Sequence, residues 1–364
     1  MYRNIFKKYI ILLILMLGLI LLIIRSQSAI EAARGALILC YQTVIPTLFP
    51  FFVLSKIFID GGFASICAKI FYPITRALLG INGVASLPFL LGILSGYPTG
   101  AKCVMSLYES GQITKEEVKR LLPICNNAGP LFIIGAVGCV MLGQLRLGVY
   151  LYVVHILSAF ISAIIQRFFY RQSNNSTCAF KIAEQGILPV FSAAVTDSVF
   201  TMLTVCGFVV FFAVFITCVS PFFDSFLPAG VSLFCKGLLE VTNGAYLLTS
   251  FIASPRILLT ALSAIIGFGG VCVVMQVVAI TKGIGLMQYV LGKILQGIIS
   301  AIILFVSYPY CGVHFLPMVS ISVGSFSNSF VDRVPSYTSI VPVFLLFIFV
   351  AFKMKYKAKN SQKK

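Results

Sequence analysis

The chain has 364 residues, of which 59% are hydrophobic and only 10% are charged. Because soluble domains carry about a quarter charged residues, this composition excludes a water-soluble globular protein and indicates a polytopic membrane protein. At roughly 20 apolar residues per crossing, the length accommodates about ten membrane segments in an all-α fold.

Basic residues cluster at both ends of the chain. Six of the 27 lysines and arginines lie in the tail 353–364, and Arg3, Lys7 and Lys8 precede the first apolar run. Basic clusters beside apolar segments mark the cytoplasmic side of a membrane. We therefore expect a multi-pass protein of the cell membrane with both termini, including the basic tail, in the cytoplasm. The net charge of +17 then reports orientation in the lipid bilayer and predicts no nucleic-acid partner.

Residues 1–30 are predicted to form an N-terminal anchor helix. The apolar run Tyr9–Ile24 has the length of a signal-peptide core. However, Arg25 follows it directly, and Ser26–Ala29 is a poor context for cleavage. A retained helix is therefore the preferred interpretation.

Residues 31–171 form the first of two predicted related halves. Phe63–Leu79 is amphipathic and fits the membrane interface. The apolar stretch Val84–Leu94 is too short to cross a bilayer and ends in the glycine- and proline-containing segment Ser95–Lys102. A short apolar segment, a break and a second short segment predict a re-entrant hairpin.

A second break follows in the same half. Thr114 and Glu117 have the spacing of a capping box and predict a helix start. This helix is interrupted between Pro123 and Pro130 and then resumes. A polar linker, residues 172–186, is predicted to separate the two halves.

Residues 187–352 are predicted to repeat the plan as a second half. The short apolar piece Ile257–Ile266 runs into Gly267–Gly270, which predicts a second re-entrant hairpin. The last apolar span is Tyr337–Phe352, directly before the basic tail. We therefore expect two pseudo-repeated halves, each with a broken re-entrant hairpin.

The two halves align at a nearly constant offset, with Gly96 against Gly269 and Gly111 against Gly283. Paired interrupted segments in corresponding halves point to the binding site of a transporter. We expect an inverted repeat with a site between the two hairpins.

The first break offers groups that suit an anion. Breaking a helix in lipid leaves backbone groups without partners, at a cost of several kcal/mol each, unless they bind something. Helix N-termini favour anions, and Lys102 adds a cation. Alternatively, the break serves only helix packing and Lys102 reaches the interface. The predicted substrate-binding residues of this segment are Ser95, Gly96, Tyr97, Pro98, Thr99, Gly100 and Lys102.

Other polar residues in apolar surroundings extend the candidate site. Asn126 and Asn127 could bind a polar solute or merely cap the resumed helix. Glu240 lies in an apolar run, where a carboxylate is costly and usually functional. It could bind a coupling cation or proton, or pair with a buried lysine or arginine. Asp197 is left out because it could be an N-cap. The set is completed by Asn243, Gly269, Gly270 and Gln276.

No pattern in the chain indicates an enzyme. His155 and His314 are the only histidines, and the eleven cysteines include no C-x-x-C pair. We find no nucleophile with a base and no spacing typical of metal ligands. We therefore expect no catalytic residue, no metal and no cofactor.

The motif Ser95–Lys102, followed by Asn126–Gly135, resembles the sporulation integral membrane protein YlbJ (SpoVV) family, whose members carry nucleoside recognition (Gate) domains. Gly237–Glu240, and Gly269–Gly270 with Gln276, are also similar. The resemblance implies that the two halves are Gate-like repeats. It implies a protein of endospore-forming bacteria in the outer forespore membrane that moves dipicolinic acid, a small aromatic dicarboxylate, towards the spore.

The expected function is therefore transport of a small anionic solute, dipicolinic acid in particular, by alternating access. A nucleoside carrier and a non-transporting assembly factor of the spore envelope are the alternatives. Association of identical copies into a homo-oligomer is left open.

Overall fold

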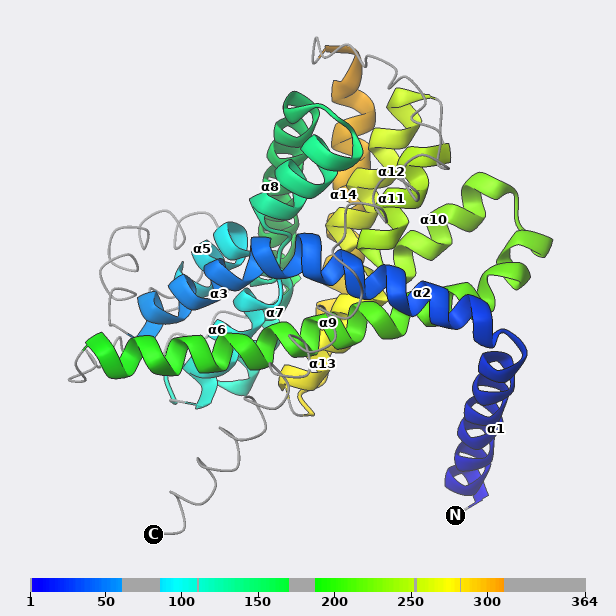
Figure 1. The fold of residues 1–364 in the computed structure, drawn as a ribbon. Coiled ribbons are helices and arrows are strands. Elements are labelled where there is room, and N and C mark those ends of the chain that lie inside the picture. The colour runs from blue at the N-terminus through cyan, green and yellow to red at the C-terminus, as the bar shows by residue number, and fades with distance from the viewer. Residues whose placement is uncertain are drawn as a thin grey trace.

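The computed structural model describes residues 2–60, 86–109, 111–169, 187–251, 254–281 and 283–310. Within these ranges every regular element is a helix, so the all-α fold is confirmed there (Figure 1). The expected interfacial segment 63–79, the linker 172–186, the final span 337–352 and the tail 353–364 lie outside the described residues.

The N-terminal helix stands apart from the rest of the molecule. Helix α1 (Tyr2–Ile24) is followed after Arg25 by α2 (Ser26–Leu39), and the two are bent by 93°. In Figure 1, α1 projects away from the other helices. Its apolar side chains are exposed, with Leu13 at 71% and Ile23 at 75%. Such a surface suits contact with lipid.

A long, nearly continuous run follows α1 and lies along the longest helix. It consists of α2, the π-helical segment η1 (Cys40–Val44) and α3 (Ile45–Asp60). Its partner is α9 (Ile187–Phe226), a helix of 40 residues. Apolar side chains of both runs form a shared core, made of Cys40, Val44, Phe52, Met202, Val205, Cys206 and Val209.

The first half begins with a packed helical hairpin. Helix α5 (Ser86–Ser95) turns at Gly96 and continues as α6 (Thr99–Glu109), and the two pack against each other. This confirms the helix–break–helix pattern expected around Ser95–Lys102.

The first half continues with a broken helix and a long helix. The expected capping box starts α7 (Lys115–Cys125): Glu117 N donates to Thr114 Oγ1 at 3.3 Å, and Thr114 N donates to Glu117 Oε2 at 2.8 Å. After the break, the chain resumes as the π-helical η3 (Leu131–Met141), which packs along α8 (Leu145–Phe169).

The second half has its hairpin earlier than predicted. Helix α10 (Ala229–Leu239) folds back on α11 (Val241–Phe251) at Glu240. The approach is so close that a Cβ on Gly244 would overlap the backbone of Gly237.

The prediction of a re-entrant hairpin at Gly267–Gly270 is therefore wrong. Helices α12 (Pro255–Phe268) and α13 (Gly270–Thr281) instead form one apolar run of 27 residues, long enough to cross a membrane. Gly269 and Gly270 both adopt positive φ, 88° and 82°, which interrupts the helix without reversing the chain. Helix α14 (Met287–Ser307) and the short 3₁₀ turn η4 (Tyr308–Tyr310) complete the described chain.

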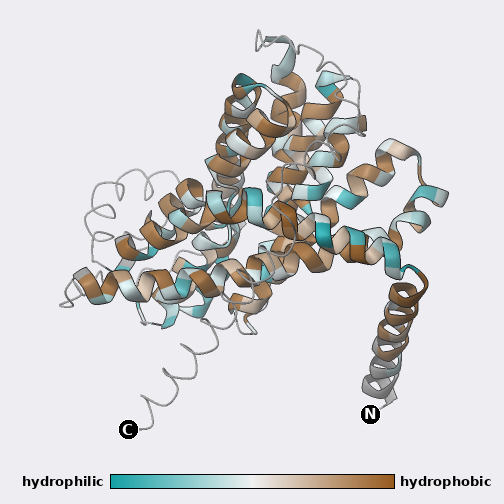
Figure 2. Ribbon diagram, viewed as in Figure 1, coloured by the Kyte–Doolittle hydropathy of each residue, from teal (hydrophilic) through white to brown (hydrophobic). Residues whose placement is uncertain are grey.

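The described ranges contain fewer helices long enough to cross a membrane than the ten membrane segments expected. In the described ranges, four helices are long and apolar enough to span a bilayer, and the bent pair α1–α2 would add a fifth. The expected ten segments are not supported, because several apolar helices, such as α5, η3 and α10, have only 10 or 11 residues. Figure 2 shows that hydrophobic residues, in brown, predominate along most of the helices. The structure is an all-α membrane protein.

Small residues allow the helices to approach closely, as is usual in membranes. A Cβ on either Gly92 or Gly100 would overlap the carbonyl group of Cys125, where the hairpin α5–α6 meets the end of α7. Gly267 of α12 likewise lies against Gly297 of α14. The contacts of Gly92 and Gly100 hold the hairpin α5–α6 against the end of α7, directly before the first helix break.

We expect Gly92→Ala to destabilise the protein, because the added methyl group has no room beside the Cys125 carbonyl. Overpacking of this kind costs about 1–3 kcal/mol and should lower Tm by about 5 °C. The chain has no Trp and eleven Cys, so a thiol-reactive dye can follow thermal unfolding in detergent. Gly207→Ala is the matched control, because a Cβ added at Gly207 would have no neighbouring atom of the described residues within 4 Å. Equal Tm values for both variants would contradict the close approach.

Candidate functional site

Four interruptions of the helices meet at one place, here called the junction. They are the hairpin tips at Gly96 and Glu240, and the helix breaks at Asn126–Pro130 and Gly269–Gly270. A Cβ on Gly96 would lie 2.6 Å from Gly129 N. A Cβ on Gly270 would lie 3.3 Å from Leu239 O. Each hairpin tip therefore packs against the broken helix of its own half.

The junction encloses a hollow of about 50 Å³. Its lining combines both hairpin tips and both broken helices, with α3 and α9 closing one side. A space of this size holds a few water molecules or an ion, but it is too small for an aromatic solute. The polar or backbone-exposing residues that line it are Gly96, Tyr97, Gly129, Glu240, Thr242 and Gln276.

Glu240 is buried at the tip of the second hairpin, with 1% of its surface exposed. Its carboxylate accepts hydrogen bonds from Thr242 N at 2.8 Å and from Asn243 N at 2.7 Å. These are unpaired donors of the first turn of α11, where a negative charge is favourable. Within the described part of the chain, no lysine or arginine forms an ion pair with Glu240. Glu240 thus caps α11 and also lines the hollow.

Two polar atoms at the junction have no hydrogen-bond partner among the described residues. They are Tyr97 Oη and Gln276 Oε1, and both are buried. Within the described residues, the Gln276 amide nitrogen donates to Cys272 Sγ at 3.6 Å, and this sulfur is a weak acceptor. An unsatisfied buried polar group costs about 1–3 kcal/mol. These atoms are therefore available to a polar ligand.

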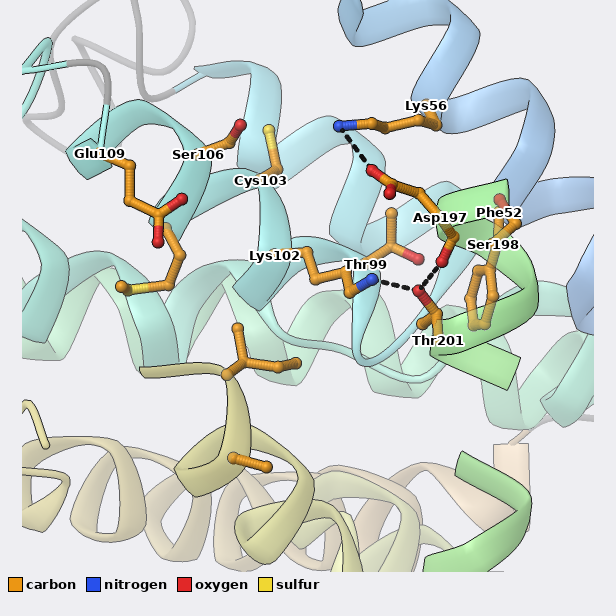
Figure 3. A pocket seen from close by; sticks show the side chains of 13 residues that line it. Phe52, Lys56, Thr99, Lys102, Cys103, Ser106, Glu109, Asp197, Ser198 and Thr201 are labelled. Carbon is orange, nitrogen blue, oxygen red and sulfur yellow. Dashed lines mark hydrogen bonds and ion pairs between the residues drawn. The ribbon is translucent and has the colours of Figure 1, made fainter. Parts of the chain in front are cut away.

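A larger cavity of about 300 Å³ lies beside the junction, between α3, α6, α9 and α13 (Figure 3). Lys56 from α3 faces Asp197 from α9, with Nζ and Oδ2 3.2 Å apart, and it also pairs with Asp60 at 3.2 Å. Lys102 from α6 points across the cavity and donates to Thr201 Oγ1. Of the two lysines in this cavity, Lys56 is thus the one with a carboxylate partner among the described residues.

Lys102 is the cation of this cavity that is left for a ligand. No carboxylate of the described residues lies within ion-pairing distance of its Nζ. Its one hydrogen-bond acceptor in these ranges is the Thr201 hydroxyl, which itself donates to Asp197 O at 2.7 Å. Because an ammonium has three donors, two remain for an incoming anion.

A third hollow of about 180 Å³ lies next to both the large cavity and the junction hollow. It shares Lys102 and Thr201 with the large cavity, and Gln276 and Val205 with the junction hollow. Three neighbouring hollows with shared lining residues, here called the line of cavities, therefore lie between Lys102 and Gln276, and Pro98 lines the middle one.

The predicted pair Asn126 and Asn127 lies apart from these cavities, and both side chains are fully buried. Asn126 Nδ2 donates to Tyr289 Oη at 2.8 Å, and Asn127 Nδ2 donates to Ile124 O at 2.8 Å. Neither residue lines any of the three cavities. Protein groups surround these two side chains, whereas Gly129 of the same break lines the junction hollow.

The other predicted residues divide between lining and packing. Thr99 lines the large cavity, and its Oγ1 is buried without a partner among the described residues. Ser95 Oγ shares a hydrogen bond with Ser55 Oγ. Gly100 occupies a close backbone contact with Cys125, whereas a Cβ on Gly269 would meet side chains of Val273 and Tyr97 at 3.8–3.9 Å, and neither glycine lines any of the three cavities. Asn243 also has a buried Nδ2 without a partner in these ranges, but it lines none of the three cavities.

Sequence reasoning missed Lys56, Asp197 and Thr201 in the large cavity. Asp197 lies well inside α9, so it is not the N-cap that its position suggested. The available signal was a charge inside each of two apolar runs, which is unusual in a membrane segment. Nothing in the sequence indicated that these two charges pair. Among the residues described, no group of three or more His, Cys, Asp or Glu side chains gathers around a metal position.

Comparison with known proteins finds a relative of similar sequence. No family model matches it, and no solved structure matches it. The sporulation integral membrane protein YlbJ of Bacillus subtilis (strain 168) is 28% identical over 312 residues, which covers 76% of each of the two chains. The chain is thus similar to this sporulation integral membrane protein over about three quarters of its length, which supports the family resemblance that its motifs indicate.

Proposed function

We propose that this protein is a sporulation membrane carrier of a small anionic solute, with dipicolinic acid as the candidate substrate. The role in sporulation rests on the name of its relative. The proposed place of action is the outer forespore membrane, with both termini in the cytoplasm. An enzymatic activity is not proposed.

The observation that carries the proposal is the ammonium of Lys102, which has no carboxylate partner among the described residues and lies in a cavity of about 300 Å³. Cavities of this size are at the lower end of those that hold small molecules. The two remaining donors of Lys102 can meet a carboxylate, and charge-assisted hydrogen bonds of this kind are the strong ones. The buried Thr99 Oγ1 and Ser198 Oγ, which lack partners among the described residues, supply further polar contacts to the same space.

The line of cavities supports movement of the solute between Lys102 and the junction. In the described conformation the junction hollow, at about 50 Å³, is too small for a dicarboxylate. Passage therefore requires the hairpin tips to separate from the broken helices. This is the kind of rearrangement that alternating access demands.

An internal repeat is also part of the proposal. Each half runs in the same order: a packed hairpin, a broken helix and a long helix. The sets are α5–α6, α7–η3 and α8 in the first half, and α10–α11, α12–α13 and α14 in the second, with corresponding helix starts about 140 residues apart. This pairing replaces that of Gly96 with Gly269, because it matches hairpin with hairpin.

Lys102→Ala is expected to lower uptake of labelled dipicolinate into proteoliposomes at least about tenfold, because a charge-assisted contact is worth about 1.5–3 kcal/mol. Lys102→Arg should keep part of the uptake. Lys119→Ala is the matched control, because Lys119 pairs with Glu116 away from the cavities and should leave uptake unchanged.

Full uptake by Lys102→Ala would contradict the proposed anion site. Uptake that excess nucleoside abolishes, but excess dipicolinate does not, would favour a nucleoside carrier. Absence of any uptake by the wild-type protein would favour an assembly factor.

Gln276→Leu separates binding from stability at the junction. The substitution removes a buried Oε1 that has no partner among the described residues, so Tm should stay the same or rise. Dipicolinate uptake should nevertheless fall severalfold, because the solute loses a polar contact on its path. A lower Tm with a proportionate loss of uptake would show that Gln276 serves only the packing of α13.

Deletion of the gene in its host should give spores with little dipicolinic acid, measured by terbium fluorescence after spore lysis. The wild-type gene should restore the content, whereas Lys102→Ala should not, although the protein accumulates in the membrane. Restoration by Lys102→Ala would favour the assembly factor, because that role does not need a cation in the cavity.

A further inference from the structure

Lys293 of α14 is a fully buried lysine, with 1% of its surface exposed. Burying an ammonium away from water is costly unless it is paired and hydrogen-bonded. In the ranges that the structure describes, no carboxylate lies within ion-pairing distance of Lys293. Lys236, the other buried lysine of these ranges, does have a counter-charge, because its Nζ lies 2.8 Å from Asp224 Oδ1.

Three neutral oxygens take the place of a counter-charge at Lys293. Its Nζ lies 2.9 Å from Asn126 O, 2.5 Å from Gln296 Oε1 and 3.5 Å from Asn127 Oδ1. An ammonium carries three donors and no acceptor, so its donors match this set in number. Asn126 is the residue that ends α7, and the carbonyl end of a helix carries partial negative charge.

The oxygens are held in place by their own hydrogen bonds. Gln296 Nε2 donates to Asn127 Oδ1 at 3.1 Å, which leaves Gln296 Oε1 directed at the ammonium. Asn126 Nδ2 donates to Tyr289 Oη at 2.8 Å, and Ala128 N donates to His155 Nε2 at 3.1 Å. The first helix break is therefore a preorganised cluster of amide and carbonyl oxygens around one positive charge.

Carbonyl and amide oxygens at the end of a broken helix are the ligands with which membrane transporters coordinate Na⁺. Rings of carbonyl oxygens likewise bind K⁺ in channels. Here the same kind of ligand set surrounds an ammonium that is covalently attached to the protein.

We propose that the first helix break is a monovalent-cation site that Lys293 occupies permanently with its ammonium group, as a tethered cation. The break is then held together without a dissolved Na⁺ or K⁺, and no coupling ion binds at this position. The inference does not depend on which solute the protein carries.

The test compares Tm of the purified full-length protein in detergent, followed with a thiol-reactive dye, in four chloride salts of equal ionic strength: sodium, potassium, methylammonium and choline. The wild-type protein should have the same Tm within about 1 °C in all four, because its site is filled. Specific stabilisation of the wild-type protein by Na⁺ or K⁺ by several degrees would overturn the proposal, and this comparison requires no variant.

Lys293→Ala opens the site. Its Tm in choline chloride should be lower than that of the wild-type protein by about 5 °C or more. Methylammonium, which reproduces the lost head group, should restore at least half of this difference with saturable concentration dependence, whereas the bulkier choline should not. Equal Tm values of Lys293→Ala in all four salts would overturn the proposal.

Tyr289→Phe is the matched control in the same cluster. It removes one hydrogen bond to Asn126 but leaves the Lys293 ammonium in place. We expect a lower Tm that does not depend on the cation. Selective restoration of this variant by methylammonium would show that the effect is unrelated to the site of the ammonium, and would also overturn the proposal.

Discussion

Inside a lipid bilayer, every backbone amide and carbonyl must find its partner within the protein or in an enclosed polar space. This constraint governs the structure wherever a helix stops short of crossing the membrane. The chain interrupts its helices at two hairpin tips and at two breaks around the junction, and these four interruptions lie together. Their proximity lets one interruption pack closely against another, as Gly96 does against Gly129.

The backbone groups that these interruptions expose nevertheless find their partners in different ways. At Asn126–Pro130, side chains from α8 and α14 satisfy the broken backbone, with His155 and Lys293 as the principal partners. At Glu240, a carboxylate caps the following helix, and a small hollow remains beside it. Buried polar atoms without partners among the described residues occur at both places: Asn126 Oδ1 at the first, and Tyr97 Oη and Gln276 Oε1 beside the second. The asparagine side chains of the first break lie among protein groups, however, whereas Glu240 faces a hollow. This difference is the reason that the proposed solute path follows α6, α9 and α13 rather than α7 and η3.

Close backbone contacts decide which parts can move relative to one another. Gly92 and Gly100 bring the first hairpin against the end of α7, whereas Gly237 and Gly244 bring the two arms of the second hairpin together. The junction hollow lies between the tips of these two units, and the large cavity with the Lys56–Asp197 ion pair lies between the first hairpin and helices α3, α9 and α13. A carrier that works by moving one unit against another would open along this boundary.

The sequence by itself determined that the protein lies in a lipid bilayer and where some of its helices begin or are interrupted. The apolar composition predicts a membrane protein, and the Thr114–Glu117 spacing and the glycines at 96 and 269 predict a helix start and two interruptions, because these depend on local chemistry alone. Only the tertiary structure decided that Gly269–Gly270 interrupts a straight run while Glu240 turns a hairpin, since chain reversal depends on what packs beside the break. The same holds for Lys293, whose oxygen partners come from its own helix and from residues more than 160 positions away. Burial and pairing of such distant groups are properties of the assembled fold, and no local pattern of residues encodes them.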